Sequence, residues 1–355
     1  MQAAFMGEQT MSLPRVCVLI PAYNAGRTLR GCLEALCRQQ RLPDQVVVVD
    51  NASTDGTGDV ARSFVDRLPG LVILQEPRPG EPIARNRGLQ AVDADVVAFT
   101  DADCVPREDW LVSVLECFRS SPSCHAVAGK VVGHRPRSLA EKYLSVVGFP
   151  TPEEPETVEG TRFPPRTFYT ANLAVRREVL QALGGFDERL NVGCDVDLCV
   201  RLLRAGYRIR YQPEVVVAHA HRDSLGKAGR RIWQYGTGVP LWFRKHAEPG
   251  LWITLPGGRA MRLRVPLRGW INLSTPDRCI LAFGVLAVWQ PWTAALLVNY
   301  LARLSWRVRD LARRRGVPLS PWELLAVTAL HVVEFAVFTA GSISGSLRQR
   351  VLCVV

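Results

Sequence analysis

Short apolar runs alternate with helix-like stretches through the first hundred residues of the chain. The runs are rich in Val, Ile and Leu, and the stretches between them carry apolar residues at helical spacings, as at Leu29, Leu33 and Leu36. Strands that are apolar on both faces and alternate with helices are typical of a parallel sheet covered on both sides. We therefore predict an α/β fold with a Rossmann-like, mostly parallel central sheet flanked by helices. Four runs are expected to form its strands: 16–21, 45–50, 71–76 and 95–100.

Acidic side chains stand directly after two of these strands. Asp50 ends the second strand, and Asp101 and Asp103 follow the fourth. In open parallel sheets, ligands bind beyond the carboxyl ends of the strands, where loops converge and helix N-termini point inward. One or two carboxylates can hold a divalent cation there while a substrate diphosphate supplies further oxygens. An isolated Asp-x-Asp is more often a solvated turn, but its position after a buried strand favours a metal site.

Five ordered motifs between residues 16 and 235 resemble those of one enzyme family, the inverting family-2 glycosyltransferases with the GT-A fold. The resemblance implies a nucleotide-diphosphate-sugar donor and a divalent metal cofactor, Mn²⁺ or Mg²⁺. The motifs are Pro21-Ala22-Tyr23-Asn24, Val49-Asp50-Asn51-Ala52-Ser53-Thr54-Asp55-Gly56-Thr57, Ala84-Arg85-Asn86-Arg87-Gly88, Thr100-Asp101-Ala102-Asp103 and Gly184-Gly185-Phe186-Asp187-Glu188.

The resemblance also implies roles for individual residues on the donor side. The loop 21–24 and Asp50 would lie near the nucleotide base, and Asp101 near the ribose or the diphosphate. Asp103 would carry the metal. Arg85 matches a basic position close to the donor, although an arginine in the N-terminal turn of a helix is about as often part of a surface ion pair.

The acceptor half of the domain is expected after a Pro- and Glu-rich stretch, 150–165, whose composition indicates a loop or a flap. The segment 168–177, which contains Asn172, resembles the family segment beside the acceptor site. Family members then place a Glu-Asp pair at the start of a helix, and its aspartate accepts the proton of the attacking hydroxyl. Here the pair is Cys194-Asp195, so Asp195 is the expected catalytic base.

Two residues beside the expected base have alternative interpretations. Cys194 replaces the usual glutamate, so either the acceptor site is remodelled for a less polar or differently oriented hydroxyl, or the cysteine only packs. Asp197 lies in the same acceptor region. Arg201 stands one helical turn after it, and this spacing favours an i,i+4 ion pair.

A strand is expected at 215–217, leading into His219-Ala220-His221. Alternate residues of a strand share a face, which makes His221 a candidate for an additional metal or phosphate contact, with an ordinary loop histidine as the alternative. Processive polysaccharide synthases of the family carry a Gln-x-x-Arg-Trp signature near this point, and the sequence has no such string. The resemblance therefore favours transfer of a single sugar.

Composition divides the chain into four parts. Residues 1–14 form a tail without the apolar core of a signal peptide, 15–240 the catalytic domain, 241–276 a basic interfacial linker and 277–355 a membrane-associated helical region. In the last part, the apolar segments 279–302 and 321–341 are long enough to span a bilayer. The net charge is +11, and positive side chains become more frequent toward the C-terminus. This distribution fits binding to a membrane surface better than binding to nucleic acid, because the sequence has no recognisable nucleic-acid-binding motif.

The connection between the two apolar segments is rich in arginine, which favours the cytoplasmic side of the membrane. The catalytic domain is expected on that side as well, because nucleotide sugars are made in the cytoplasm. Two straight spans would place the arginine-rich connection outside, whereas a re-entrant or interfacial first segment that turns at Gln290-Pro291 removes the conflict. The ten cysteines show no metal-binding spacing and are expected to be reduced thiols.

These observations predict a glycosyltransferase at the cell membrane that moves one sugar to a lipid-linked or glycan acceptor in envelope or exopolysaccharide synthesis. Two other functions are alternatives to this prediction. A sugar nucleotidyltransferase usually carries a Gly-rich phosphate loop after the first strand, and the sequence after 16–21 has none. A catalytically weak subunit that binds sugar nucleotides in a membrane complex is supported only by Cys194, and the retained Asp195 argues against it.

Overall fold

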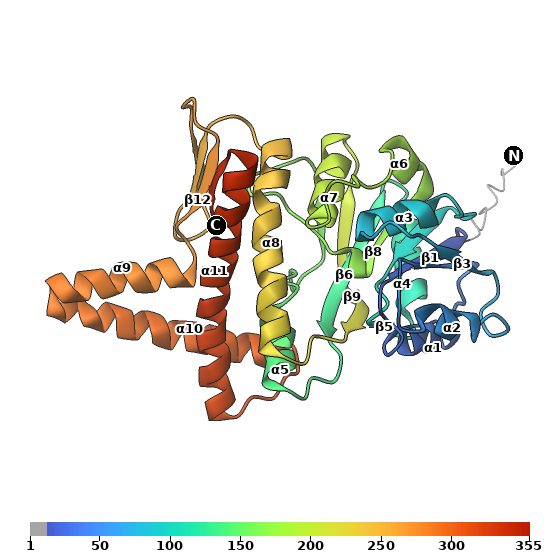
Figure 1. Ribbon diagram of the computed structural model, residues 1–355, viewed down its shortest axis with the longest axis horizontal. Helices are drawn as coiled ribbons and strands as arrows, with labels where there is room; N and C mark the ends of the chain where they lie inside the picture. Colours follow the sequence, from blue (N-terminus) through green and yellow to red (C-terminus); the bar gives the residue numbers. More distant parts are fainter. Residues whose placement is uncertain (1–12) are drawn as a thin grey trace, which may run out of the picture.

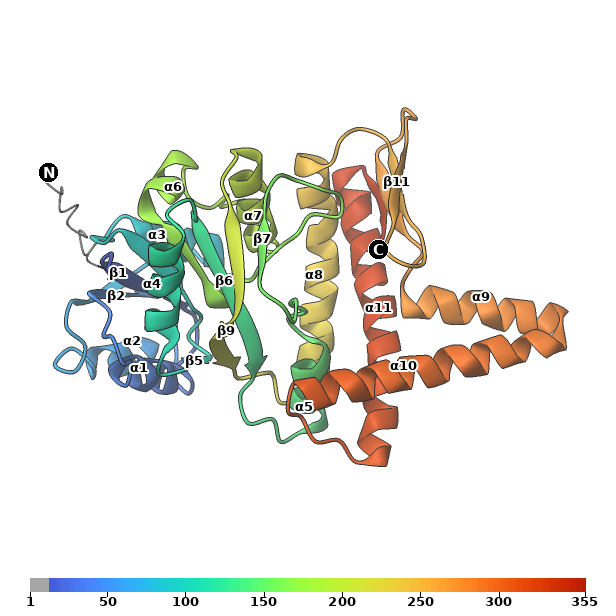
Figure 2. The same ribbon diagram turned by 180° about the vertical axis from the view of Figure 1, so that it is seen from behind.

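The computed structural model describes residues 13–355, and its largest element is a sheet that comprises nine strands within that range. The strand order is β3-β2-β1-β4-β8-β6-β9-β5, and β7 also pairs with β9 (Figures 1 and 2). The first four strands are parallel, whereas β8 and β5 run antiparallel to the strands beside them. The strands are β1 (Val16–Ala22), β2 (Gln45–Asp50), β3 (Leu71–Gln75), β4 (Val96–Phe99), β5 (Cys104–Pro106), β6 (Ala126–Gly133), β7 (Glu156–Val158), β8 (Leu173–Arg176) and β9 (Ile209–His219).

Both faces of the parallel part of this sheet are buried. Along β1, Val18 and Ile20 pack with α1 and α4 on one face, while Cys17 and Leu19 pack with α3 and α7 on the other. All four side chains have no exposed surface, which explains why the predicted strands contain so few polar residues. The predicted α/β fold is therefore confirmed. The helices of this domain are α1 (Leu29–Cys37), α2 (Thr57–Arg62), α3 (Glu81–Leu89), α4 (Trp110–Ser120), α5 (Leu139–Val147), α6 (Arg177–Ala182) and α7 (Cys194–Arg204).

The strand register brings the acidic residues to one edge of the sheet. Ala22 at the end of β1 pairs with Asp50 at the end of β2, and β4 lies parallel to β1 on its other side. Asp101 and Asp103 follow β4 directly, so they lie at the same edge as Asp50. This is the edge at which parallel sheets bind ligands.

The C-terminal part begins with a long helix, α8 (Leu225–His246), and a second long helix, α11 (Pro321–Gln349), packs along it (Figures 1 and 2). Glycines allow the two backbones to approach closely. A Cβ atom on Gly236 would lie 2.2 Å from the carbonyl oxygen of Phe338, and one on Gly341 would lie 2.4 Å from that of Trp233. A small sheet of order β11-β10-β12-β13 lies next to these helices. Its strands are β10 (Leu251–Thr254), β11 (Ala260–Leu263), β12 (Gly269–Asn272) and β13 (Leu352–Val354).

A helical hairpin, which follows β12 and precedes α11 in the chain, projects away from the rest of the molecule (Figures 1 and 2). Its arms are α9 (Pro276–Trp289) and α10 (Ala294–Arg314), joined by the short 3-10 turn η2 (Pro291–Thr293). The base of α10 packs through Val308 and Ala312 against residues of α5 and α11.

Several expectations about the boundaries need correction. The predicted linker, 241–276, folds as the end of α8 followed by β10, β11 and β12, and the predicted boundary at 240 lies inside α8. The stretch 150–165 contains a short strand, β7, in addition to loop. Of the predicted tail, residues 1–12 lie outside the described residues.

The apolar segment 279–302 is two helices rather than one span. Proline has no backbone N–H and its ring disfavours helix in the residue before it, so α9 ends just before Pro291, and the predicted turn at Gln290-Pro291 is confirmed. Among the residues from 13 onward, only α11, which contains the second apolar segment, is long and apolar enough to cross a membrane. All ten cysteines are free thiols, as predicted.

Candidate active site

Hydrogen bonds around Asn24 join the loops that follow β1 and β2. The backbone N–H of Asn24 donates to Ser53 Oγ at 3.0 Å, and the backbone N–H of Thr54 donates to Asn24 Oδ1 at 2.9 Å. Asp50, which is 8% exposed, accepts the backbone N–H of Ser53 at 3.2 Å. The structure thus brings together the loop 21–24 and Asp50, the two features that the family resemblance places near the nucleotide base.

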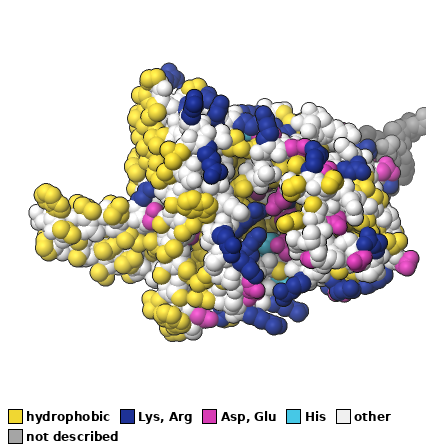
Figure 3. All heavy atoms as spheres, in the orientation of Figure 1, with side chains coloured by type: hydrophobic (Ala, Val, Ile, Leu, Met, Phe, Trp, Pro, Cys, Tyr) yellow, Lys and Arg dark blue, Asp and Glu magenta, His cyan; other side chains and the backbone are white. Residues whose placement is uncertain are grey.

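The four residues of the loop 21–24 differ in exposure. Pro21 and Ala22 belong to β1 and are half-buried and buried, whereas the Tyr23 side chain is 63% exposed. Asn24 has a φ of 47°, a left-handed conformation that asparagine tolerates better than most residues. The loop therefore presents an exposed aromatic ring at the edge of the sheet where Asp50 ends β2. Figure 3 shows acidic, basic and histidine side chains close together near the middle of the face that it draws.

Arg85 of α3 lies inside the site and is only 1% exposed. Its Nη2 donates to Asp101 Oδ1 at 2.9 Å, and its Nη1 donates to Cys194 Sγ at 3.6 Å and to Glu81 Oε2 at 3.4 Å. One guanidinium therefore connects the carboxylate after β4 to the first residue of α7. The interpretation of Arg85 as a surface pair is wrong, because the side chain is buried.

Burial and mutual charge together set the ionisation of this cluster. Burial raises the pKa of the Asp101 carboxyl, and the Arg85 guanidinium opposes that shift. Burial also disfavours the charged form of Arg85, but the surrounding acidic groups outweigh it and raise the pKa of the guanidinium. Removal of Asp101 would leave the buried charge of Arg85 with less compensation, which is unfavourable, whereas the Asp101 carboxylate is 29% exposed.

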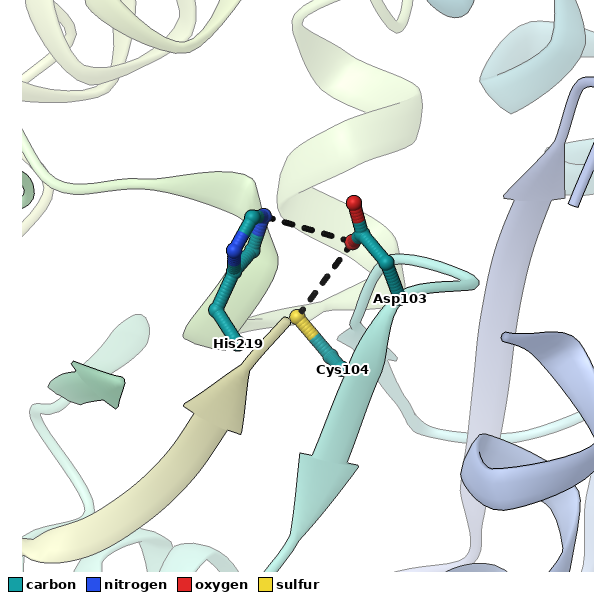
Figure 4. Close-up of side chains that lie close together, drawn as sticks. All are labelled: Asp103, Cys104 and His219. Carbon is teal, nitrogen blue, oxygen red and sulfur yellow. Dashed lines mark hydrogen bonds and ion pairs between the residues drawn. The ribbon is translucent and has the colours of Figure 1, made fainter. Parts of the chain in front are cut away.

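Asp103 and His219 form a candidate cation site (Figure 4). His219 Nε2 lies 3.3 Å from Asp103 Oδ1, and the backbone N–H of Ala220 donates to the carbonyl oxygen of Asp103 at 2.8 Å. Ligand atoms of Asp103, Cys104 and His219 all lie within 4.8 Å of one another. Adjacent ligands of an octahedral ion with bonds of about 2.1 Å are about 3 Å apart, so the oxygen and nitrogen atoms fit a divalent cation.

Protonation states favour Asp103 and His219 over Cys104 as ligands. Burial lowers the pKa of His219 to about 4, so its imidazole is neutral at physiological pH, as a metal ligand must be. Its Nδ1 has no hydrogen-bond partner among the residues the structure describes. Burial raises the pKa of Asp103 to about 6, whereas it raises that of Cys104 so far that the thiol keeps its proton. Since a cysteine binds metal as the thiolate, the carboxylate and the imidazole are the better donors.

His221, the predicted additional metal ligand, lies next to His219, with ring centroids 4.8 Å apart. Burial lowers its pKa to about 3, so it is also neutral. The contact with Asp103, however, is made by His219, the last residue of β9. The metal role of His221 stays a prediction, and the geometry favours His219 as the histidine beside Asp103.

Phe149 forms a wall of the cation site. Its ring centroid lies 5.0 Å from that of His219 and 5.9 Å from that of His221. Arg315, which follows α10, donates from Nη2 to the carbonyl oxygen of Phe149 at 3.0 Å and from Nη1 to that of Gly148. Phe149 has a φ of 49°, which is rare for a bulky residue and persists only where neighbours hold it. The base of the projecting hairpin thus positions a side chain that contacts both histidines.

Asp195 lies in the first turn of α7, which begins at Cys194 as predicted. The carboxylate is half-buried, and its Oδ1 accepts the backbone N–H of Val196 at 2.8 Å. Burial raises the pKa of this carboxyl, while the Val196 hydrogen bond and the charge of Arg85 oppose the shift. A carboxylate with a raised pKa is a stronger base than an ordinary exposed one.

Cys194 is 4% exposed and belongs to the core cluster that includes Leu198 and Phe186. Burial raises its pKa to about 12, so the thiol is neutral at physiological pH. The glutamate charge that the family places beside the base is therefore not replaced by a thiolate. Both interpretations of Cys194, packing and a remodelled acceptor site, are compatible with this position.

Asn172, assigned to the acceptor region from the sequence, is 2% exposed and holds three segments together. Its Oδ1 accepts from Trp110 Nε1 at 2.9 Å, and its Nδ2 donates at 2.9 Å to the carbonyl oxygens of Lys130 and Val215. With its amide fully engaged inside the domain, Asn172 has a structural role rather than an acceptor-binding one.

Asp197 has no exposed surface and forms the predicted ion pair with Arg201, with 2.7 Å between Oδ2 and Nε. Its Oδ1 also contacts Lys245 Nζ at 2.5 Å and His246 Nε2 at 2.7 Å. These contacts attach α8 to α7. An acceptor role for Asp197 stays a prediction, and its observed partners are all structural.

Sequence reasoning missed the role of Glu81. Its carboxylate contacts Arg85 and also Arg231 of α8, with 3.0 Å between Oε1 and Nη2. Burial would raise the pKa of Glu81, but the two arginines outweigh it and lower the pKa. The i,i+4 spacing of Glu81 and Arg85 could have predicted their ion pair from the sequence. The contact of Glu81 with Arg231, 150 residues away, has no signal in the sequence.

The covered, mostly parallel sheet and the carboxylates gathered at its edge define a GT-A type α/β transferase. The chain belongs to the family-2 glycosyltransferases: residues 14–236 match the family described as Glycosyltransferase like family 2. Residues 159–339 also match the family described as Glycosyl transferase family group 2. The resemblance drawn from the five motifs is thereby confirmed.

Curated relatives carry glycosyltransferase names. Pre-mycofactocin glycosyltransferase of Mycobacterium tuberculosis (strain H37Rv) is 35% identical over 269 residues, which cover 73% of this chain and 52% of that protein. Glycosyltransferase AglE of Haloferax volcanii is 30% identical, covering 66% of this chain and 76% of AglE. The O-antigen chain rhamnosyltransferase RfbN of Salmonella typhimurium is 26% identical, covering 62% and 71%. The chain spans about half the length of the mycobacterial relative.

Solved structures share the fold. The mannosyltransferase PcManGT of Pyrobaculum calidifontis, in complex with GDP-Man and Mn²⁺, has a TM-score of 0.55 and 23% identity, covering 96% of this chain and 88% of that one. S. aureus TarS 1–349 in complex with UDP-GlcNAc has a TM-score of 0.50 and 16% identity, covering 95% and 92%. At these identities, the likeness establishes the GT-A fold alone.

Proposed function

We propose that the chain transfers one sugar from a nucleotide diphosphate to a hydroxyl of a lipid-linked or glycan acceptor, with inversion, in cell-envelope or exopolysaccharide synthesis. The observation that carries the proposal is the position of Arg85, which contacts Asp101 at 2.9 Å and Cys194 at 3.6 Å. Cys194 precedes Asp195, the candidate base, so this guanidinium connects the donor side of the site to the base side. A displacement reaction needs both sides within one small volume.

The donor binds at the carboxyl edge of the sheet in this proposal. Tyr23, Asn24 and Asp50 receive the nucleoside, and Asp101 lies toward the ribose or the diphosphate. Two proteins of the same fold were solved with nucleotide sugars, one with GDP-Man and one with UDP-GlcNAc. They support the donor class and leave the base and the sugar of this chain's donor open.

Asp103 and His219 would hold a divalent cation, with Asp101 and His221 as further candidates. When bound, such a cation neutralises the charge that develops on a departing diphosphate. A donor set of one carboxylate oxygen and one imidazole nitrogen favours Mn²⁺ over Mg²⁺, because Mg²⁺ prefers oxygen ligands. A fold neighbour, PcManGT, was solved with Mn²⁺.

Asp195 accepts the proton of the attacking hydroxyl. Its Oδ1 is occupied by the backbone N–H of Val196, which leaves Oδ2 for the acceptor. An attack from the side opposite the departing diphosphate inverts the anomeric carbon in a single displacement.

The test is release of nucleoside diphosphate from a panel of nucleotide sugars, with Mn²⁺ or Mg²⁺, by the full chain extracted in mild detergent. One donor should turn over, and Asp195→Asn should lower the rate roughly 10²–10⁴-fold while donor binding persists. Asp103→Ala should remove the metal dependence together with most of the activity. Asp93→Asn is a matched control, because Asp93 is an exposed partner of Arg15 away from the site. If donors bind and none turns over, even with membrane lipid extract, the chain is a sugar-nucleotide-binding subunit and the proposed enzymatic function is wrong.

A further inference from the structure

The projecting hairpin α9–α10 is apolar and exposed. From residue 279 to residue 302 the sequence contains no charged side chain. At the tip, Val288 is 82% exposed, Trp289 80% and Trp292 71%. Figure 3 shows apolar side chains over the length of the hairpin. A water-soluble surface rarely presents so many adjacent large apolar groups, so the hairpin needs an apolar environment.

The apolar part of each arm is too short to cross a bilayer. The apolar part of α9, 279–289, measures about 17 Å, and that of α10, 294–302, measures about 14 Å. The hydrocarbon core of a bilayer is about 30 Å thick, so each arm reaches about half of that depth or slightly more. These dimensions match insertion into one leaflet, with the tip near the middle of the membrane.

Basic side chains mark the level at which the hairpin would leave the hydrocarbon. Exposed arginines begin directly after the apolar part of α10, at the point where a helix in one leaflet reaches the headgroups. Positive charge at this depth favours anionic lipid, and aromatic residues such as Trp306 are also common there. The arginines are Arg303, Arg307, Arg309, Arg313 and Arg314.

The long helix α11 cannot cross the membrane in the observed arrangement. It packs along α8, and α8 is tied to the catalytic domain by Arg231 with Glu81 and by His246 with Asp197. A bilayer around α11 would therefore also surround α8, which carries exposed basic side chains at both ends. In Figures 1 and 2 the hairpin extends away from α11 on the side opposite α8.

We propose that α9–α10 is a re-entrant hairpin that inserts into one leaflet of an anionic bilayer, while α11 lies along the membrane surface instead of spanning it. The hairpin anchors the chain, and the basic base of α10 selects anionic headgroups. Because Arg315 follows α10 and holds Phe149 against His219, the anchor is directly connected to the candidate cation site.

Flotation with lipid vesicles tests the anchor, and this readout does not depend on turnover. The full chain should float with phosphatidylcholine vesicles that contain phosphatidylglycerol, and less with phosphatidylcholine alone. The tip variant Trp289→Glu/Trp292→Glu should reduce the floating fraction at least roughly tenfold, since a charge in hydrocarbon is costly. The base variant Arg307→Glu/Arg313→Glu should lose the preference for anionic lipid. Leu42→Glu/Val65→Glu, exposed apolar positions in the catalytic domain, should float like the wild type.

Thiol labelling tests the depth, with protein added from outside to vesicles that contain a trapped impermeant maleimide. A cysteine at Val288 should escape the trapped reagent, and cysteines at Trp322 and Leu347, at the two ends of α11, should both react with reagent added outside. Reaction of any of these positions with the trapped reagent would mean that a helix spans the bilayer. A detergent-free dimer that does not float would mean that a second copy covers the hairpin. Either result overturns the proposal. Donor turnover by the tip variant in detergent separates a membrane defect from misfolding.

Discussion

Arg85 Nη2 lies 2.9 Å from Asp101 Oδ1, and the guanidinium is 1% exposed. This pair holds Asp101 toward α3, while Asp103, two residues later, contacts His219. The two acidic residues of the Asp-x-Asp motif therefore have different partners.

Arg85→Met should destabilise the fold, because Asp101, whose side chain is 29% exposed, would lose its buried partner. Since only the arginine of the pair is fully buried, we expect a loss of roughly 1.5–3 kcal/mol in the free energy of unfolding, the range for hydrogen bonds to charged groups. Urea denaturation of the single variants and of Arg85→Met/Asp101→Asn measures the coupling. The double variant should recover part of the loss. Strictly additive losses would show that the two side chains do not stabilise each other.

Cys194→Glu should shift the acid limb of the rate profile upward in pH. A second carboxylate beside Asp195 disfavours the ionised base and raises its pKa, so activity is lost at a higher pH as the solution is acidified. The profile of kcat/KM against pH measures this, and Cys194→Ser, which adds no charge, is the control. Assays with a panel of acceptors test whether Cys194 remodels the acceptor site. Unchanged acceptor specificity in the Cys194→Glu variant would contradict that hypothesis.

Binding of Mn²⁺ should weaken below about pH 6. Burial raises the pKa of Asp103 to about 6, so protons compete with the cation for the carboxylate at and below that pH. Affinity should fall up to about tenfold for each further pH unit, with proton release on binding. Titration calorimetry in buffers of different ionisation enthalpy measures both quantities. Constant affinity between pH 7 and pH 5 would exclude Asp103 as a ligand that must lose a proton.

Arg315→Met should weaken Mn²⁺ binding about tenfold, at the low end of the effect of residues that support a metal ligand. The substitution removes the hydrogen bonds that hold Phe149, whose ring packs on His219. Electron paramagnetic resonance of free Mn²⁺ gives the dissociation constant without any assay of turnover. Arg314→Met, at an exposed neighbouring position paired with Asp310, should leave the constant unchanged. Equal effects of both substitutions would point to general loosening of α10.

Asp197→Asn should lower the free energy of unfolding by roughly 3–5 kcal/mol at neutral pH, because Lys245, His246 and Arg201 lose their shared anion. Burial opposes ionisation of Asp197, but these partners lower its pKa to about 2. A carboxyl with a depressed pKa stabilises the fold above its ordinary pKa near 4, and this contribution disappears as pH falls toward 2. Chemical denaturation across this pH range should show a weaker pH dependence in the variant. Asp310→Asn, at an exposed ion pair, is the control.

The parts of the site that could be predicted are those encoded by local pattern. The ends of β2 and β4, which carry Asp50 and precede Asp101, were predictable because buried strands have short-range signatures. The start of α7, which carries Asp195, was predicted from the resemblance of contiguous motifs to the family. The choice of His219 over His221 was not predictable. It depends on the pairing of β5 with β9, which brings Cys104 opposite His219.

The same distinction applies to the C-terminal part. A proline between two apolar stretches predicted the turn of the hairpin, since that signal is local. The strands β10, β11 and β12 were missed, because alternating Arg and apolar residues fit a strand as well as an interfacial segment. Hydropathy made 321–341 a candidate span, and the packing of α11 against α8 could not be predicted from hydropathy.

By itself, the sequence determined the alternation of strands and helices, the acidic residues at the strand ends and the family, because apolar periodicity and contiguous motifs are local properties. Only the tertiary structure decided that Arg85 joins Asp101 to the helix of Asp195, that Glu81 meets Arg231, and that Arg315 supports Phe149. Each of these contacts joins residues far apart in the chain. They form only when burial of the two faces of the sheet and packing of α8, α10 and α11 bring those segments together.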